Sequence, residues 1–307
     1  MKLKNLSLAF AAILLTIFFI SCKKDNNALD YTNEISSQSD DQSRFNTETD
    51  LVINETNVAL ESSSSFTGRG NNLQFICDAT IVVDTVSNPR TITITYNGTN
   101  CLGNRTRTGI VVISMAQGVQ WKNPGAVVNV IFKNFKITRL SDNKSITING
   151  THTYTNVSGG LLINLPTLNT ITHTLTSSNM SITFDNGSQR NWQVAQQRVF
   201  TYNNGVVITT TGTHSQGNTT GIAAWGTNRF GNPFTCVITQ PLVIKQDCNF
   251  RLVSGEILHD GPIVNVTTTF GLDSNGDPTS CPGSGNYYMK IVWTGLGGNT
   301  HTVILPY

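Results

Sequence analysis

Apolar and polar side chains alternate along most of this chain, in short runs rich in Thr, Ile and Val that begin near residue 73. In the clearest run, residues 91–96, isoleucines alternate with threonines. Such alternation is typical of a β-strand with one buried face, and roughly fourteen runs of this kind follow one another to the C-terminus. The pattern therefore predicts an all-β body over residues 70–307.

Asn-Gly and Asp-Gly pairs separate several of these runs and predict how the strands are connected. They begin at Asn186, Asn204, Asp260 and Asn275. These pairs supply the positive φ angles that tight hairpins require, whereas a parallel crossover needs a connection of about a dozen residues or more. We therefore expect antiparallel sheets that form a sandwich or a barrel, because each apolar face must be buried.

One segment before the β body has a helical pattern. Between residues 39 and 61, apolar residues recur at near-helical spacing, among them Phe45, Leu51, Val52 and Val58. This predicts a short N-terminal helix that packs on the outside of a sheet. Residues 22–38 are polar, without periodic apolar positions, and are expected to form a flexible tether. The alternative for residues 39–61 is a frayed continuation of that tether.

Residues 1–21 have the layout of a secretory signal. Lys2 and Lys4 precede an apolar stretch of about fifteen residues, which is short for a transmembrane helix of about twenty. The stretch ends at Ser21 and Cys22, and polar residues follow. This predicts a lipoprotein signal peptide, after whose removal Cys22 carries acyl chains that anchor the protein to a membrane. The alternative is an ordinary signal with an incidental cysteine.

The composition narrows the range of partners. Charged residues make up 12% of the chain, about half of the usual share, and Thr, Asn, Ser and Gly supply the polar surface. The net charge of +2 comes from 20 basic and 18 acidic residues, and the β body contains no dense basic cluster. A nucleic-acid partner is therefore not expected, because it requires a basic surface.

Six cysteines are present, and acylation of Cys22 would leave five in an oxidising compartment. Sequence alone allows several pairings of these five. We favour two disulfides that each bracket neighbouring strand-like segments, Cys77–Cys101 and Cys248–Cys281. Cys236 would then be a free thiol that behaves as a small apolar residue.

A short motif occurs twice in the β body. Residues 146–152 and 208–214 share the pattern I-T-x-x-G-T-H. Two related sheet units, stacked or side by side, would explain the repetition. The alternative is chance similarity in a chain rich in threonine.

Several short motifs occur together over most of the mature chain, in residues 101–110, 132–135, 247–248 and 254–255, in both I-T-x-x-G-T-H segments and around Cys281. This combination resembles a group of uncharacterised lipoproteins of Bacteroidota. The resemblance implies a secreted, lipid-anchored all-β protein and no particular activity. Surface-exported lipoproteins of that phylum carry an acidic cluster after the cysteine, where this chain has Lys23 and Lys24. We therefore expect a location at the outer membrane, and both its periplasmic and its external face stay open.

A further pattern, Asp84-Thr85-Val86, resembles the glycosylation acceptor of the same phylum. The resemblance implies a glycan on Thr85.

The chain contains no nucleophile elbow, zinc-binding helix motif or phosphate-binding loop, and we expect no cofactor. Four of the five histidines share strand parity with neighbouring apolar residues, namely His152, His173, His214 and His301. They could meet at a metal ion or serve as hydrogen-bonded core residues. We favour the second interpretation and expect no metal.

Two tryptophans lie in Gly-containing segments that we expect to be loops. Trp121 is one, and Trp225 is the other, with Asn228 and Arg229 close behind it. Indole faces stack on the apolar faces of sugars, and loops on a rigid sheet often form binding sites. These four residues are the candidate ligand-binding site. The alternative is that both tryptophans plug the ends of the β core.

These features favour a lipid-anchored cell-envelope protein with a non-catalytic binding or structural role, whose ligand is a glycan or another envelope component. One alternative is a secreted glycan hydrolase whose acid and base are carboxylates scattered over the sheet. Another is an adhesin or scaffold that binds other proteins.

Overall fold

The computed structural model of the protein describes residues 32–63, 66, 76–261, 264–281, 285–295 and 298–307. Residues Thr32–Tyr307 form one compact unit. The expected signal peptide, Cys22 and residues 22–31 of the expected tether lie outside the described residues. None of the described helices is both long enough and apolar enough to cross a membrane.

The described chain consists of one long helix, followed by fifteen strands and three short helical turns. The helical elements are α2 (Thr32–Ser62), η1 (Leu162–Asn164), α4 (Leu165–Leu168) and η2 (Gln246–Cys248). The strands are β1 (Ala79–Asp84), β2 (Arg90–Thr99), β3 (Arg105–Met115), β4 (Ala126–Arg139), β5 (Ser145–Asn156), β6 (Thr170–Phe184), β7 (Gln189–Tyr202), β8 (Val206–Gly212), β9 (His214–Gln216), β10 (Thr219–Thr227), β11 (Pro233–Lys245), β12 (Arg251–Asp260), β13 (Asn265–Leu272), β14 (Tyr288–Thr294) and β15 (Thr300–Pro306).

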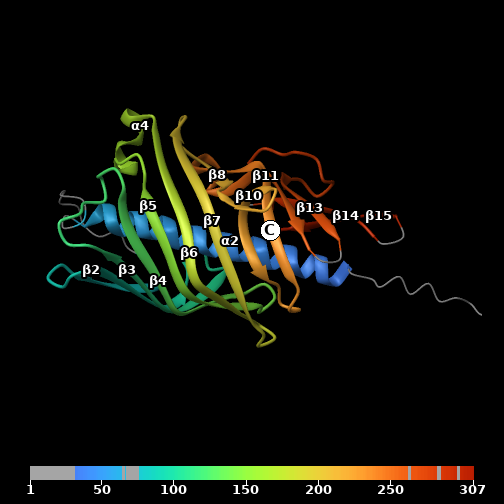
Figure 1. The fold of residues 1–307 in the computed structure, drawn as a ribbon, viewed down its shortest axis with the longest axis horizontal. Coiled ribbons are helices and arrows are strands. Elements are labelled where there is room, and N and C mark those ends of the chain that lie inside the picture. Colours follow the sequence, from blue (N-terminus) through green and yellow to red (C-terminus); the bar gives the residue numbers. More distant parts are fainter. Residues whose placement is uncertain (1–31, 64–65, 67–75, 262–263, 282–284, 296–297) are drawn as a thin grey trace, which may run out of the picture. The chain divides into compact units, whose positions relative to one another are not determined.

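All fifteen strands belong to a single antiparallel sheet (Figure 1). Consecutive strands are neighbours from β1 to β7 and from β10 to β15. Between β7 and β11, the place of one strand is shared by β8 and β10: Arg198 of β7 pairs with Thr210 of β8, and Val194 pairs with Ala224 of β10. The predicted all-β antiparallel fold is confirmed, and short hairpins connect the strands because the turns supply positive φ angles.

A line of β-bulges bends the sheet across β3 to β6. The register shifts at similar heights in the pairs β3–β4, β4–β5, β5–β6 and β6–β7. Gly109, Asn134, Gly150 and Asn179 all have positive φ along this line, which we call the crease. At Gly109, an added Cβ would lie 2.2 Å from the carbonyl oxygen of Asn134. Because bulges bend and twist a strand, the crease curves the sheet around what it encloses.

The enclosed element is α2, which crosses the strands on one side of the sheet (Figure 1). Among residues 33–62, only Asn33 and Thr47 are exposed. Phe45 of the helix packs against Trp192 of β7 with ring centroids 5.3 Å apart. The interior is thus closed by a helix, where the sequence suggested a second sheet or a closed barrel.

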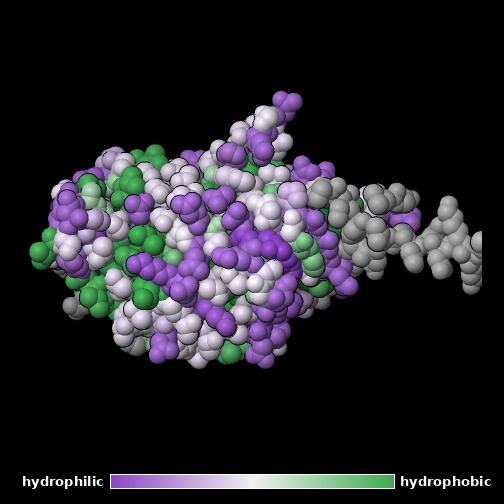
Figure 2. Space-filling model, turned by 60° about the horizontal axis from the view of Figure 1, so that its bottom comes forward, coloured by the Kyte–Doolittle hydropathy of each residue, from purple (hydrophilic) through white to green (hydrophobic). Residues whose placement is uncertain are grey.

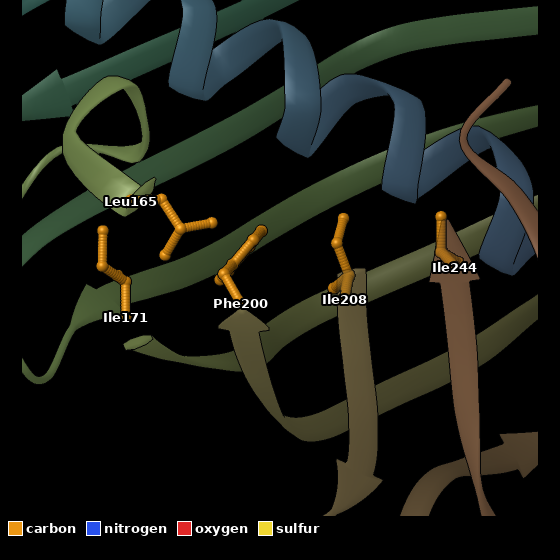
Figure 3. Close-up of a cluster of buried hydrophobic side chains, with 5 residues drawn as sticks. All are labelled: Leu165, Ile171, Phe200, Ile208 and Ile244. Atoms are coloured by element: carbon orange, nitrogen blue, oxygen red, sulfur yellow. The ribbon is translucent and has the colours of Figure 1, made fainter. Parts of the chain in front are cut away.

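An apolar cluster lies on the helix side of the later strands. Figure 3 shows its five buried side chains spread over α4 and four strands, with α2 passing above them: Leu165, Ile171, Phe200, Ile208 and Ile244. The burial of such side chains favours folding by about 1.5–3 kcal/mol each. The cluster therefore fixes the strand ends near α4 to one another.

The helix predicted over residues 39–61 lies within the longer α2, so residues 32–38 of the expected tether are helical. The two I-T-x-x-G-T-H segments occupy different positions: residues 146–152 lie within β5, whereas residues 208–214 run from β8 into β9. Both belong to the same sheet.

Two disulfides join the pairs that the sequence favoured. Cys77 bonds Cys101, and Cys248 bonds Cys281, while Cys236 is free and buried in β11. Burial raises the pKa of the Cys236 thiol above its ordinary value, because the thiolate would lack solvation. Cys236 is therefore a core residue in the described fold.

Candidate functional site

The inner side of the sheet holds a strongly acidic helix. α2 carries seven acidic residues and one basic residue, Arg44. Ten of its buried residues are polar or charged, whereas six are apolar. A helix whose buried residues are mostly polar gains less from the hydrophobic effect than an apolar one. Its position must therefore depend also on the charges and hydrogen bonds that meet it.

Strand-connecting turns provide the partners for the first third of α2. Arg229 donates two hydrogen bonds to the carboxylate of Asp41, from Nε at 2.7 Å and Nη2 at 2.6 Å. Asp40 forms ion pairs with Arg139 at 2.9 Å and with Lys144 at 3.6 Å. Bidentate arginine–carboxylate pairs are among the strongest of such contacts. They fix this part of α2 to the β4–β5 and β10–β11 turns.

Arginines of the strands hold the rest of the helix. Glu48 pairs with Arg105 of β3. Glu55 accepts hydrogen bonds from Arg107 at 2.8 Å and from the Tyr96 hydroxyl at 2.5 Å. Farther along the same side of the sheet, Asp50 pairs with Arg198 of β7. Glu61 accepts hydrogen bonds from the backbone N–H groups of Leu162 and Ile163. The carboxylates of α2 are thus bound from β3 to β10.

Burial and the arginines act in opposite directions on these carboxyl groups. Burial raises the pKa of Asp41, Glu48, Asp50 and Glu55, while the paired arginines lower it, and the net direction is upward. Desolvation disfavours the charged form of a carboxyl group. Each carboxylate therefore needs its arginine to remain ionised.

The interface between α2 and the sheet also contains polar atoms that lack a hydrogen-bond partner among the described residues. On the helix they belong to Gln38, Gln42, Arg44, Glu48, Thr56 and Asn57. On the sheet they belong to residues of β5, β6 and β7 and of the segment before β4, namely Trp121, His152, His173, Trp192 and Arg198. Buried polar groups usually find a partner in protein or water. The contact therefore combines apolar packing with many buried polar groups, unlike an apolar core.

Trp121 packs inside the protein. Its side chain is fully buried, stacks on Tyr154 with ring centroids 5.5 Å apart, and also contacts His173. It has no exposed face to offer a ligand. The expectation of a sugar-binding surface at Trp121 is therefore wrong in this state of the protein, because the segment before β4 folds inward.

Asn228 and Arg229 likewise serve the fold. Asn228 is buried, accepts the N–H groups of Phe230 and Asn232, and donates to Glu34 of α2 at 3.1 Å. Arg229 binds Asp41 as described above. Their polar groups are occupied by the chain itself, so we correct their assignment from ligand-binding residues to residues that position α2.

Trp225 lies in a strand, where the sequence suggested a loop. It is half-buried in β10, opposite Gln193 of β7 and Thr235 of β11. Its neighbour Ala224 is fully buried, so Trp225 points to the outer side of the sheet, since side chains alternate along a strand. His214 stacks on it with ring centroids 4.1 Å apart and planes 17° apart. Both rings remain partly exposed.

The histidines do not gather in one place. His152 and His173 are buried on the inner side, where burial lowers the pKa of each to about 3. His214 lies on the outer side, and His301 is exposed above Trp293 at the edge of the sheet. Within the described ranges, the one group with metal-ligand spacing contains no histidine, and two of its three members form the Cys248–Cys281 disulfide.

Thr85 lies in the exposed turn between β1 and β2. Asp84 accepts hydrogen bonds from the backbone N–H groups of Val86 and Ser87 at 2.9 and 3.0 Å. Val86 is 89% exposed. The turn therefore offers the Thr85 side chain to solvent, as a modification on this residue would require.

Comparisons with protein-family models, with curated proteins and with solved structures give no match to this chain. Its function must therefore be inferred from its own geometry.

Sequence reasoning missed the pairing between α2 and the arginines. Asp41 and Arg229 are 188 positions apart, and no local pattern connects them. One signal was available, because seven acidic residues within 31 positions are conspicuous in a chain of low charge.

Proposed function

We propose that the protein is a lipid-anchored cell-envelope protein that binds a glycan without catalysis, at an outer-face site centred on Trp225 and His214. Acylation of Cys22 would hold it at a membrane, which we take to be the outer membrane. The outer face itself would contact the ligand, while α2 and the inner side provide rigidity.

The stacked pair of Trp225 and His214 carries this proposal. Aromatic rings that keep part of their surface exposed can pack against the apolar face of a sugar ring. Gln193 and Thr235 flank Trp225 on the adjacent strands and offer amide and hydroxyl groups. Further threonines face outward at partly exposed positions of β5 and β6: Thr151, Thr153, Thr155, Thr172 and Thr174. This uncharged polar face suits a neutral glycan.

The carboxylates of the inner side support a non-catalytic role. A glycosidase needs two carboxyl groups on either side of the scissile bond, separated by about 5–10 Å. The acidic residues of α2 are instead occupied by arginines, amides and backbone N–H groups. These partners occupy carboxylates that a glycosidase would need free for catalysis, which supports a binding role.

A binding screen tests the proposal. The mature chain without its acyl groups is titrated with a panel of envelope and extracellular glycans, and Trp225→Ala and His214→Ala are compared with Thr209→Ala. Loss of the aromatic contact should weaken binding about fivefold or more, since aromatic contacts contribute about 1 kcal/mol or more. Thr209→Ala, on the same face in β8, should bind nearly as the parent does.

Each other outcome has a distinct meaning. Binding that is unchanged in Trp225→Ala would remove the site, and release of shortened glycan would favour the hydrolase alternative. Crosslinking to partner proteins, with no glycan bound, would favour a scaffold or adhesin. Intact mass of the protein from its native membrane tests the anchor, since acylation at Cys22 is expected and an unmodified cysteine would contradict it.

A further inference from the structure

Three turns at one end of the strands expose large apolar side chains. Leu102 in the β2–β3 turn is 76% exposed, Leu140 in the β4–β5 turn is 44% exposed, and Phe230 in the β10–β11 turn is 48% exposed. The lower strand ends of Figure 1 come forward in Figure 2, where the surface is mainly hydrophilic or neutral with separate hydrophobic patches. Single exposed apolar residues are common, and turns at the opposite end also expose them, as at Val86 (89%) and Ile163 (60%). The position of these three relative to the anchor must therefore decide whether they matter.

The same three turns surround the beginning of α2. Arg139 and Lys144 flank Leu140 and form ion pairs with Asp40. The backbone N–H of Leu140 donates to the carbonyl oxygen of Asn104, at 3.0 Å, which joins the β4–β5 turn to the β2–β3 turn. Leu102 and Leu140 therefore lie on adjoining turns.

The third turn meets α2 even closer to its start. Arg229 binds Asp41, and Asn228 and Asn232 donate to Glu34. Phe230 follows Arg229 directly. The apolar tips of all three turns are thus fixed along the first half of α2, between Glu34 and Glu48.

The length of chain before α2 decides which end can reach a membrane. Ten residue steps separate Cys22 from Thr32, and a fully extended chain spans at most about 36 Å over that length. α2 runs twenty-nine steps from Thr32 to Glu61, or about 44 Å at 1.5 Å per residue. Glu61 binds the backbone of Ile163, so the opposite end of the fold lies farther from the entry point than the anchor can extend.

We propose that the end of the fold that carries Leu102, Leu140 and Phe230 rests on the lipid bilayer, with these three side chains in the interfacial region. The proposal depends on the anchor at Cys22 that the proposed function includes. The acyl chains on Cys22 hold the protein at the membrane. The three apolar tips add a weak contact that orients the molecule, with Ile163 pointing away from the membrane.

This orientation has a consequence for ligand binding. The outer face with Trp225 stands beside the bilayer, and the turns that carry Thr85 and Ile163 lie at the far end of their strands. A membrane-bound protein in this orientation presents its sheet to soluble or wall-attached glycans.

Depth-dependent quenching tests the proposal with the lipidated protein. Single-cysteine variants Leu102→Cys, Leu140→Cys and Phe230→Cys are labelled with a thiol-reactive fluorophore and reconstituted into vesicles of neutral and anionic phospholipid, some with brominated acyl chains. Ile163→Cys, which is 60% exposed at the other end, is the matched control. Unsubstituted protein controls for labelling of Cys236, which is buried.

Brominated lipid should quench the fluorescence of the labels at the three tips at least about twice as strongly as that of the label at Ile163, as expected for side chains in the interface. Equal quenching at all four positions, or stronger quenching at Ile163, would overturn the docking geometry and leave the anchor intact. A protein that leaves the vesicles on dilution would contradict the anchor itself, and the docking inference would fall with it.

Discussion

The ion pair between Asp41 and Arg229 allows the role of the inner charges to be measured. The side chain of Asp41 is fully buried, whereas that of Arg229 is 11% exposed. Arg229 also pairs with Asp185 at 3.0 Å and packs over the ring of Phe184. Asp41 therefore depends on Arg229 for its charge, while Arg229 keeps other partners when Asp41 changes. The two single substitutions should have unequal effects.

Arg229→Met leaves a buried carboxylate without its cation and should lower the free energy of unfolding by about 3–5 kcal/mol at pH 8. Asp41→Asn keeps one hydrogen-bond acceptor and should lower it by about 1–2 kcal/mol. The double variant should be more stable than the sum predicts by about 1.5 kcal/mol or more. The exposed pair of Arg139 and Asp142 is the control, since Asp142→Asn should change stability by about 1 kcal/mol or less.

The pH provides an independent check on Arg229→Met. Burial already raises the pKa of Asp41, and loss of the arginine should raise it further. A destabilisation of about 4 kcal/mol corresponds to a rise of about three in the pKa of Asp41. Below the new pKa, Asp41 becomes protonated and the penalty shrinks, so the variant should be less destabilised at pH 5.5 than at pH 8.

Urea denaturation followed by circular dichroism gives the four free energies of unfolding. Additive effects of the two substitutions, or equal costs for both, would refute the view that the sheet holds α2 through buried charge pairs. A penalty for Arg229→Met that does not vary between pH 5.5 and 8 would refute the assignment of that penalty to the ionised Asp41.

Two further predictions concern the inner side and the crease. Burial and the nearby Arg198 lower the pKa of His152 to about 3, so below about pH 6.5 the unfolded chain binds a proton that the folded protein does not. His152→Leu should therefore remove about 2 kcal/mol of the stability that the wild type loses between pH 7 and 5. An unchanged pH dependence in urea titrations would contradict this. Gly109→Ala should destabilise by about 3 kcal/mol or more, because its Cβ would lie 2.2 Å from the Asn134 carbonyl oxygen. Gly187→Ala, with positive φ and no atom within 4 Å, should cost about 1 kcal/mol, so similar midpoints for the two would contradict the close packing at the crease.

Local patterns in the sequence were sufficient for the strands and the hairpins. Alternation places Ile92 and Ile94 on the buried side of β2, where both are fully buried, because side-chain direction along a strand depends only on position. The two disulfides could also be predicted from local patterns, because each joins neighbouring segments. The signal for the helix was also local, although its start was placed seven residues too late.

The interior could not be predicted, because it depends on partners far apart in the sequence. Arg229 stands close behind a tryptophan and resembles a ligand-binding residue, yet its partner Asp41 lies 188 positions away. Trp121 was ambiguous, since a large aromatic residue in a turn-rich segment can face in or out. Whether the sheet encloses a helix or a second sheet depends on the bulges of the crease, whose glycines and asparagines are indistinguishable from turn residues in the sequence.

Hydrogen exchange of the α2 amides tests the central claim most directly, namely that this acidic helix is held inside the sheet as part of its core. Amides of residues 41–60 should exchange as slowly as those of β4 to β7, since both would open only in global unfolding. Arg229→Met should accelerate exchange at the start of α2 before it affects the strands. Fast exchange throughout α2 beside protected strands would contradict the account.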